Sequence, residues 1–169
     1  MPIQRLNHAV LYVRDVERSA GFYRAVLGFR PVFTLPDAAF LQAEGSMNDH
    51  DLGLIQRGGQ AEDSAAGQRT VGLYHLAWEA ETLAELRQIR GKLVGAGALV
   101  SEMDHGTTKS LYAKDPDGLE FEVCWLVPAA LIAADDHQLV GDPLDLDADI
   151  RRFGADTRSG VGVSSPVQH

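Results

Sequence analysis

The sequence predicts an α+β fold built from two tandem βαβββ modules. Two segments begin alike, LNHAVLYV at residues 6–13 and LYHLAWEA at residues 73–80, and each precedes a helical pattern and three short strand candidates. Self-similarity of this kind is the signature of a duplicated structural unit. We expect modules at residues 1–60 and 71–127, a linker at residues 61–70 and a C-terminal tail at residues 128–169.

In the first module, the segment at residues 6–13 predicts a strand and the next segment predicts a helix. Asp15 is a suitable N-cap for that helix and Gly28 is a typical stop. Between them, apolar residues recur at helical spacing, at Val16, Ala20, Tyr23 and Leu27. Three short apolar runs then predict strands at residues 30–35, 39–43 and 51–56.

The second module repeats this order. After a strand at residues 73–80, a helix is expected to begin at about Thr82 and to end near Gly95 or Gly97. Its buried face is expected to hold Leu83, Leu86, Ile89 and Leu93. Strands are expected at residues 99–103, 109–113 and 119–126. The last two flank the sequence DPDG, in which proline fixes φ and glycine tolerates positive φ, and this predicts a tight hairpin turn.

The linker and the tail lack this patterning. Residues 57–69 read RGGQAEDSAAGQR, a mixture of glycine, alanine and polar residues that suits a linker. Beyond Val127, one short amphipathic piece is expected at residues 144–153, and the end from Ala155 is expected to be disordered. We expect the tail to pack on its own domain or on a partner rather than to take part in chemistry.

Composition narrows the range of functions. The chain has 169 residues, 45% of them hydrophobic, which is enough to build a core without disulfides. Its formal net charge is −9 and no basic cluster is present, which argues against nucleic acid or a membrane as the partner and favours a small molecule. The single cysteine, Cys124, suits a reducing cytoplasm and packing rather than chemistry. We expect a cytoplasmic protein that forms a homodimer or a higher homo-oligomer.

Side chains on the predicted strands suit a metal ion. His8 and His75 occupy equivalent positions in the two modules, so the repeat would bring both toward a shared axis. Glu120 and Glu122 share one face of the last strand, where burying a carboxylate is costly unless it is paired or bound to metal. Two imidazoles and one carboxylate would form the facial triad that suits non-haem Fe(II). The alternative is that both histidines are hydrogen-bonded core residues and the glutamate lies at a wet edge.

His50 lies where the polar turn NDHD becomes the apolar run LGLIQ. A histidine at the entrance of a short buried strand can point into whatever the strand lines and can exchange protons near neutral pH. A solvated turn residue is the alternative interpretation. If the metal triad exists, a proton carrier is the better interpretation of His50.

The two modules, the paired histidines and the ending DPDGLEFEV resemble the vicinal oxygen chelate superfamily. The resemblance covers roughly residues 4–126. It implies a curved mixed sheet around a metal site, and a metal-binding glutamate four residues after the turn glycine. Carried over to this chain, that glutamate is Glu122 rather than Glu120.

More closely, the chain is similar to the extradiol ring-cleaving dioxygenases of catechols, and in particular to small members with one pair of modules. That resemblance implies Fe(II) held by His8, His75 and Glu122, with Mn(II) also suited to this ligand set. It implies that His50 acts as acid and base. The stretch DHGTTKSLYAKDPDGLEFEV places a further histidine and a tyrosine, His105 and Tyr112, to hydrogen-bond the substrate oxygens. The implied substrates are a catechol and O2, as in the breakdown of aromatic compounds.

Two other functions remain open within the superfamily. A glyoxalase-like isomerase or lyase would use the metal without oxygen and would normally need a fourth protein ligand. The corresponding place in the first module falls among Gly53, Leu54 and Ile55, none of which can bind metal. A non-catalytic resistance protein that binds a small molecule would not need His8, His75 and Glu122 together.

Overall fold

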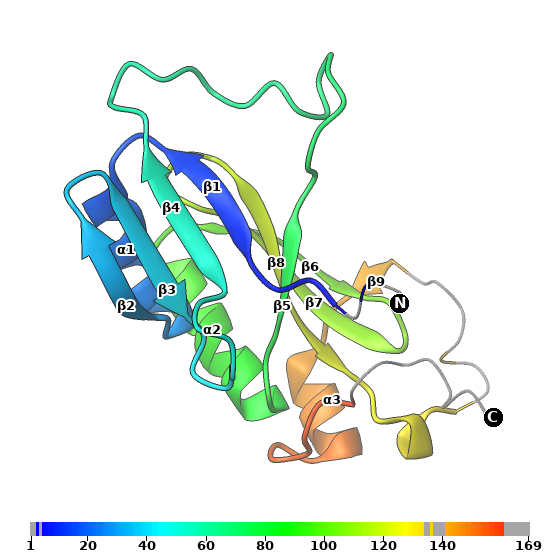
Figure 1. Ribbon diagram of the computed structural model, residues 1–169. Coiled ribbons are helices and arrows are strands. Elements are labelled where there is room, and N and C mark those ends of the chain that lie inside the picture. Colours follow the sequence, from blue (N-terminus) through cyan, green and yellow to red (C-terminus); the bar gives the residue numbers. More distant parts are fainter. Residues whose placement is uncertain (1–2, 4, 134–135, 137–140, 161–169) are drawn as a thin grey trace. The chain divides into compact units, whose positions relative to one another are not determined.

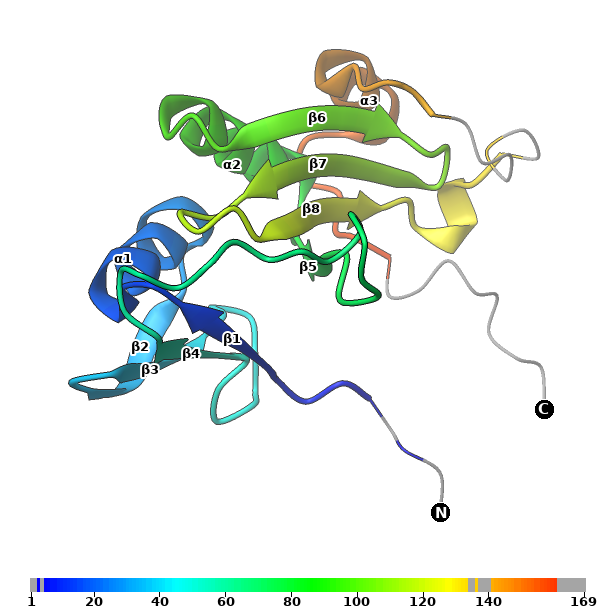
Figure 2. The same ribbon diagram turned by 90° about the horizontal axis from the view of Figure 1, so that it is seen from above.

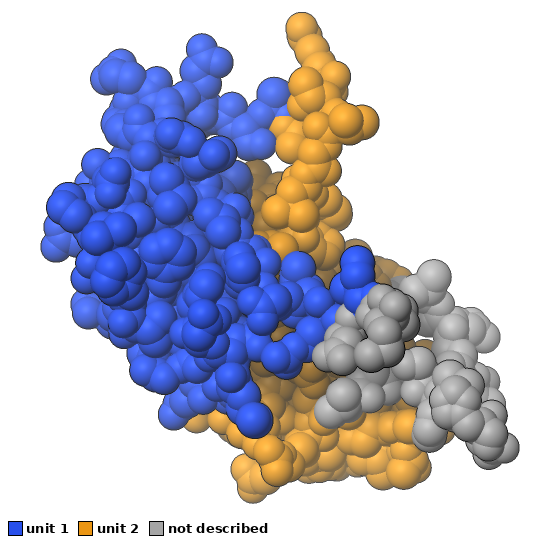
Figure 3. Space-filling model, in the orientation of Figure 1, with its two compact units in different colours: residues 1–65, 115–119 blue, residues 66–114, 120–169 orange. Residues whose placement is uncertain are grey.

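The computed structural model describes residues 3, 5–133, 136 and 141–160. The chain forms two compact units, which Figure 3 shows in different colours. Unit 1 comprises residues 1–65 and 115–119, and unit 2 comprises residues 66–114 and 120–169. The DPDG turn of the second module therefore groups with unit 1, although the strands on either side of it belong to unit 2.

Unit 1 contains a four-stranded mixed sheet and one helix (Figure 1). Its strands lie in the order β1-β4-β3-β2, with β1 parallel to β4 and the other pairs antiparallel. The expected βαβββ order is confirmed. The strand expected at residues 6–13 is shorter than predicted, and His8 immediately precedes it. The elements are β1 Ala9–Val13, α1 Val16–Leu27, β2 Arg30–Leu35, β3 Ala38–Gln42 and β4 Leu52–Gln56.

Helix α1 is defined at both ends by the residues that the sequence indicates. The Asp15 side chain accepts a hydrogen bond from the backbone N–H of Arg18, and Gly28 adopts the left-handed conformation with φ of 77°. The buried face differs slightly from the prediction, because Ser19 and Val26 are buried whereas Ala20 and Leu27 are only half-buried. The core between α1 and the sheet holds Val13, Val16, Tyr23, Leu41, Leu52 and Leu54.

Unit 1 also holds the DPDG turn. Gly118 has φ of 82°, which explains the need for glycine there. Asp115 accepts hydrogen bonds from the backbone N–H groups of Asp117 and Leu119, so its carboxylate organises the turn from within. The Tyr23 hydroxyl donates to the second oxygen of Asp115 at 3.2 Å. The turn is thus a specific polar structure and not only a tight reversal.

Unit 2 contains a five-stranded mixed sheet in the order β5-β8-β7-β6-β9, with β5 parallel to β8. Helix α2 contacts β6 and β8, and α3 packs beside α2 (Figure 2). Each unit forms its own sheet, and the expected strand–helix–strand order is again confirmed. The strand expected at residues 73–80 is shorter, and His75 immediately precedes it. The elements are β5 Leu76–Glu79, α2 Leu83–Gly95, β6 Leu99–Asp104, β7 Thr108–Lys114, β8 Glu120–Leu126, a 3-10 turn at Ala129–Leu131, β9 Asp142–Pro143 and α3 Leu146–Phe153.

Helix α2 begins with a complete capping box. The Thr82 hydroxyl accepts from the backbone N–H of Glu85, and the Glu85 side chain accepts from the backbone N–H of Thr82. Leu83, Leu86 and Leu93 are fully buried, as the helical spacing predicts, whereas Ile89 is only half-buried. Among the described residues, no helix is long and apolar enough to cross a bilayer.

The described part of the tail belongs to unit 2. The expected amphipathic piece is α3, whose N-cap is Asp145, whereas the two-residue strand β9 was not predicted. Residues 157–160 bond to the end of β8: the Trp125 indole donates to the carbonyl of Thr157, and the Ser159 hydroxyl accepts from the backbone N–H of Leu126. Residues 161–169 lie outside the described part, so the expectation of disorder is untested for them.

Candidate functional site

In unit 2, two of the expected ligands lie side by side. Strand β5 runs parallel to β8, with Ala77 beside Glu122, and this places His75 near the same carboxylate. Nε2 of His75 is 3.1 Å from Oε2 of Glu122. The glutamate is only 8% exposed, so its charge needs a cation or hydrogen bonds close by.

The separation of these two atoms suits metal binding. Ligand atoms held at about 2.1 Å from an ion in perpendicular octahedral directions are about 3.0 Å apart. The same distance also fits a hydrogen bond from the Nε2–H of His75 to the Glu122 carboxylate. The third expected ligand, His8, belongs to unit 1, and within each unit the described His, Cys, Asp and Glu residues form no group of three that could hold an ion. The triad therefore stays a prediction.

In unit 1, two of the expected site residues lie together. The ring centroids of His8 and His50 are 4.5 Å apart, and the Phe40 ring meets His50 edge-on with centroids 5.2 Å apart. Asn48 donates to the backbone carbonyl of Asn7, which connects the loop that carries His50 to the segment that carries His8. The segment before β1 and the loop before β4 therefore bring His8 and His50 together.

Hydrogen bonds indicate which ring nitrogen of each histidine is free. Nδ1 of His8 is 2.8 Å from the side-chain oxygen of Asn7, which can only accept, so in the neutral imidazole Nδ1 carries the hydrogen and Nε2 offers a lone pair. Nδ1 of His50 is 3.1 Å from Asp49. The backbone N–H of His50 also donates to Asp49 and lowers the pKa of that carboxyl, which keeps it ionised beside the ring.

The strand registers of the two units identify equivalent positions. Each candidate ligand histidine precedes its strand by one residue, and the next residue pairs with Leu52 in unit 1 and with Phe121 in unit 2. Gly53 is therefore the counterpart of Glu122. A Cβ atom at Gly53 would lie 3.2 Å from the Val10 side chain, so a larger residue there would require that side chain to shift. Unit 1 offers no carboxylate at this position, as expected.

Tyr112 and His105 form a second polar pair in unit 2. Tyr112 lies directly opposite Glu122 in the β7–β8 pairing, and its hydroxyl is 3.0 Å from Nε2 of His105. Burial and the nearby Glu122 raise the pKa of the Tyr112 phenol, so the hydroxyl remains protonated and can donate. The Tyr112 ring also meets the His75 ring edge-on, with centroids 5.8 Å apart.

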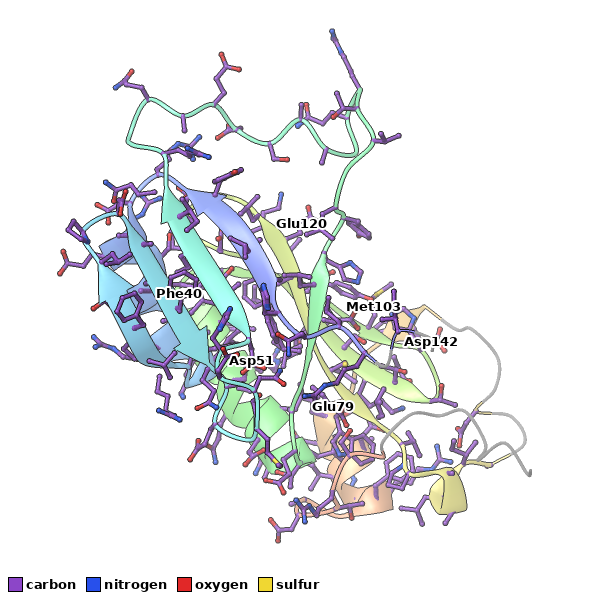
Figure 4. The ribbon with its side chains drawn as sticks, in the orientation of Figure 1. Phe40, Asp51, Glu79, Met103, Glu120 and Asp142 are labelled. Carbon is purple, nitrogen blue, oxygen red and sulfur yellow. The ribbon has the colours of Figure 1, made fainter. Side chains whose placement is uncertain are left out.

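A pocket of about 360 Å³ lies beside this pair. Figure 4 labels Met103 on β6 and Glu120 on β8, two of its lining residues. Glu120 also pairs with Lys114 at 3.3 Å, which gives it a partner that Glu122 does not share. The full lining is Tyr74, Val100, Ser101, Met103, His105, Tyr112, Ala113 and Glu120.

One residue of this region was missed in the sequence. Ser110 is fully buried, and its hydroxyl donates to Oε1 of Glu122 at 2.5 Å. The hairpin register could have revealed it, because a turn centred on Asp117 places Ser110 opposite Cys124 and diagonal to Glu122. Cys124 itself is inert, since burial raises the pKa of its thiol to about 12.

Two βαβββ units in tandem, with a half-buried histidine beside a buried glutamate in one and two neighbouring histidine rings in the other, define a class of α+β proteins that carry candidate metal ligands in both units. The chain belongs to the Glyoxalase/Bleomycin resistance protein/Dioxygenase superfamily, whose family model matches residues 5–123. The superfamily resemblance seen in the sequence is thereby confirmed.

Curated relatives include two dioxygenases. The chain is 30% identical over 118 residues to catechol-2,3-dioxygenase from Bacillus subtilis (strain 168), a match that covers 70% of this chain and 40% of that protein. It is 35% identical over 118 residues to biphenyl-2,3-diol 1,2-dioxygenase 3 from Rhodococcus globerulus, covering 68% of this chain and 59% of that protein. The chain thus spans about half the length of these relatives.

Solved structures share the fold. A glyoxylase/bleomycin resistance protein/dioxygenase domain from Frankia sp. EAN1pec has a TM-score of 0.59 at 22% identity, over 73% of this chain and 98% of that one. The fosfomycin resistance protein FosX from Listeria monocytogenes has a TM-score of 0.56 at 18% identity, over 80% and 99%. At these identities the likeness establishes the fold alone.

Proposed function

We propose that the chain is an extradiol dioxygenase, which uses Fe(II) and O2 to open the ring of a catechol next to its two hydroxyl groups. The observation that carries this proposal is the pairing of His75 with the buried Glu122, beside the Tyr112–His105 pair and a pocket of about 360 Å³. The similarity to catechol-2,3-dioxygenase and to biphenyl-2,3-diol 1,2-dioxygenase 3 supports it.

His8, His75 and Glu122 would hold the metal. Nε2 of His8 is free to bind because Nδ1 donates to Asn7, and the spacing of His75 and Glu122 fits neighbouring ligands. A bound divalent iron with open coordination positions would supply the electron transfer between the catechol and O2. Manganese suits the same donors.

The remaining side chains would bind substrate and carry protons. The Tyr112 hydroxyl, kept protonated by its raised pKa, would donate a hydrogen bond to a catechol oxygen, and His105 would orient that hydroxyl. His50 would take a proton from the catechol and return it to the product. Its Nδ1 is engaged by Asp49, which leaves Nε2 for this exchange.

The alternatives make different demands on the site. A glyoxalase-like isomerase or lyase would normally require a fourth protein ligand, and its counterpart position is Gly53. A non-catalytic resistance protein would need no metal ligands. The superfamily includes both kinds of protein, so activity must be measured directly.

The proposed function is tested by loading the purified protein with Fe(II) without air, adding a panel of monocyclic and bicyclic catechols, and then admitting oxygen. We expect one O2 consumed per catechol and the yellow absorbance of a ring-opened product. Bound iron with neither signal would favour the isomerase or lyase. No bound iron would favour the binding protein.

The ligand assignment is tested by iron content. His8→Ala and Glu122→Ala should each abolish iron binding, because a facial triad has no spare protein ligand. Glu120→Ala is the matched control, since Glu120 lies on the same face of β8 and pairs with Lys114. Metal analysis of the purified variants should find iron only in the control and the wild type. Retained iron in either ligand variant would overturn the assignment.

A further inference from the structure

The two oxygens of Glu122 have different partners. Oε1 accepts a hydrogen bond from the Ser110 hydroxyl at 2.5 Å, and Oε2 faces Nε2 of His75 at 3.1 Å. Ser110 is fully buried, and it reaches Glu122 diagonally across the β7–β8 pairing. The hydroxyl therefore fixes the rotation of the carboxylate and presents one oxygen to His75.

The other unit shows that the fold itself does not require this hydroxyl. The counterpart of Glu122 is Gly53, and the registers of β3–β4 and β7–β8 make Ala38 the counterpart of Ser110. Ala38 is also buried, at 5% exposure, so the same backbone position accepts a methyl group where no carboxylate is present. A hydroxyl is therefore present at this position only in the unit that also has the glutamate.

We propose that Ser110 is a positioning residue that makes Glu122 a ligand through Oε2 alone. This inference rests on the proposed function. A carboxylate that can rotate freely can bind an ion through both oxygens and thereby occupy a second coordination position. With Oε1 held by Ser110, that position stays open for a substrate oxygen. Groups that orient a metal ligand typically change metal affinity by about 10–100-fold when they are removed.

The test compares Ser110→Ala with wild type and with two further variants. Co(II) is titrated anaerobically as a spectroscopic probe, Fe(II) affinity is measured by calorimetry, and the melting temperature of the metal-free protein is recorded. We expect Ser110→Ala to weaken Fe(II) binding by about 10–100-fold and to change the visible spectrum of bound Co(II). Its metal-free melting temperature should stay close to that of wild type.

The two further variants distinguish an effect of the Ser110 hydroxyl on metal binding from an effect of altered packing. Ser110→Thr keeps a hydroxyl and should retain both the affinity and the Co(II) spectrum. Ser19→Ala removes another fully buried hydroxyl, on α1, and should leave metal affinity within about threefold of wild type, because the residues that orient the ligands are intact. Equal weakening in all three variants would overturn the proposal.

The outcomes distinguish this inference from the proposed function. If wild type binds Fe(II) and Ser110→Ala binds it equally well with an unchanged Co(II) spectrum, Ser110 has no positioning role, although the proposed function stands. If Ser110→Ala loses affinity only together with its melting temperature, its role is structural and the inference fails. If wild type binds neither metal, both fail.

Discussion

His50 sits in a setting that differs from that of a solvated turn residue. Its side chain is only 19% exposed, and it contacts the rings of His8 and Phe40. Nδ1 of His50 lies 3.1 Å from the Asp49 carboxylate. An imidazole placed in this way beside a candidate metal ligand suits proton transfer, because its second ring nitrogen can accept and release a proton.

We expect His50→Phe to retain iron and to lose turnover. General acid–base groups contribute about 10²–10⁴-fold to rate, so kcat for ring cleavage should fall by about 100-fold or more. Phenylalanine fills the space of the imidazole and keeps the contact with Phe40. Oxygen uptake and iron content should be measured on the same sample. Unimpaired ring cleavage in this variant would show that His50 is a turn residue without a role in proton transfer.

Tyr112 differs from the metal ligands in that its hydroxyl bonds to His105 and Ser110, neither of which is a candidate ligand. Tyr112→Phe should therefore affect the substrate more than the metal. Loss of one hydrogen bond to a charged oxygen costs about 1.5–3 kcal/mol, or about 10–150-fold in kcat/KM. Steady-state oxygen uptake, normalised to bound iron, measures this. Loss of iron from this variant would mean that Tyr112 supports the metal site.

Among the elements, α3 is connected to the sheet of unit 2 by a buried cation. Lys109 on β7 is 2% exposed, and its ammonium lies 2.6 Å from Asp104 and 3.1 Å from Asp149 on α3. Phe153 on the same helix packs against Trp125, with ring centroids 5.5 Å apart. An ion pair and an aromatic contact thus hold the tail helix.

We expect Lys109→Met to lower the free energy of unfolding by about 3 kcal/mol, because it leaves Asp149 buried without its cation. The double variant Lys109→Met/Asp149→Leu should recover most of that loss, since an apolar pair of similar size can replace a buried ion pair. Urea denaturation of the variants and wild type measures both values. A double variant as unstable as the single one would show that the ion pair is not the cause.

The Lys109–Asp149 pair also predicts how the destabilisation caused by Lys109→Met varies with pH. Burial raises the pKa of Asp149, and Lys109 opposes that shift. In Lys109→Met the folded pKa should rise further above the unfolded value, so the folded state binds more protons and stability falls as pH rises through that window. The penalty of the variant relative to wild type should therefore be smaller at about pH 5 than at about pH 7. A penalty independent of pH would contradict this.

The helices were predictable from the sequence because their signals are local. Asp15, Gly28 and Thr82 mark helix ends through their own side chains or φ angles, and the structure places caps at all three. Strand ends are set by partners instead, and for that reason β1 and β5 begin later than predicted. The two-residue strand β9 carries no sequence pattern at all, since its pairing with β6 depends on where the tail packs.

The candidate site was predictable only in part, for a related reason. His75 and Glu122 stand out because such residues are unusual in apolar strands, and the structure brings them together. Ser110 does not stand out, because a serine in a strand has no chemical signature until its register is known. Lys109 was missed because a lysine in a strand is normally exposed, and its burial depends on carboxylates from β6 and α3.

For the whole molecule, charge predicts which catechols would be preferred under the proposed function. The net charge is −9, and the lining of the pocket contains the carboxylate of Glu120 but no Lys or Arg side chain. Lys114, which pairs with Glu120, is not among the lining residues. An anionic ring substituent would be repelled both by the net negative charge of the protein and by the Glu120 carboxylate. A neutral substituent could pack against Val100 and Met103.

We therefore expect kcat/KM for 4-methylcatechol to exceed that for 3,4-dihydroxyphenylacetate by about tenfold or more at low salt. The gap should narrow with added salt, because the screening length falls from about 30 Å at 0.01 M to about 8 Å at 0.15 M ionic strength. Glu120→Gln should raise kcat/KM only for 3,4-dihydroxyphenylacetate. This separates the effect of the Glu120 carboxylate from that of the net charge of the protein. Equal rates for both catechols at low salt would show that substrate choice is set by shape and not by charge.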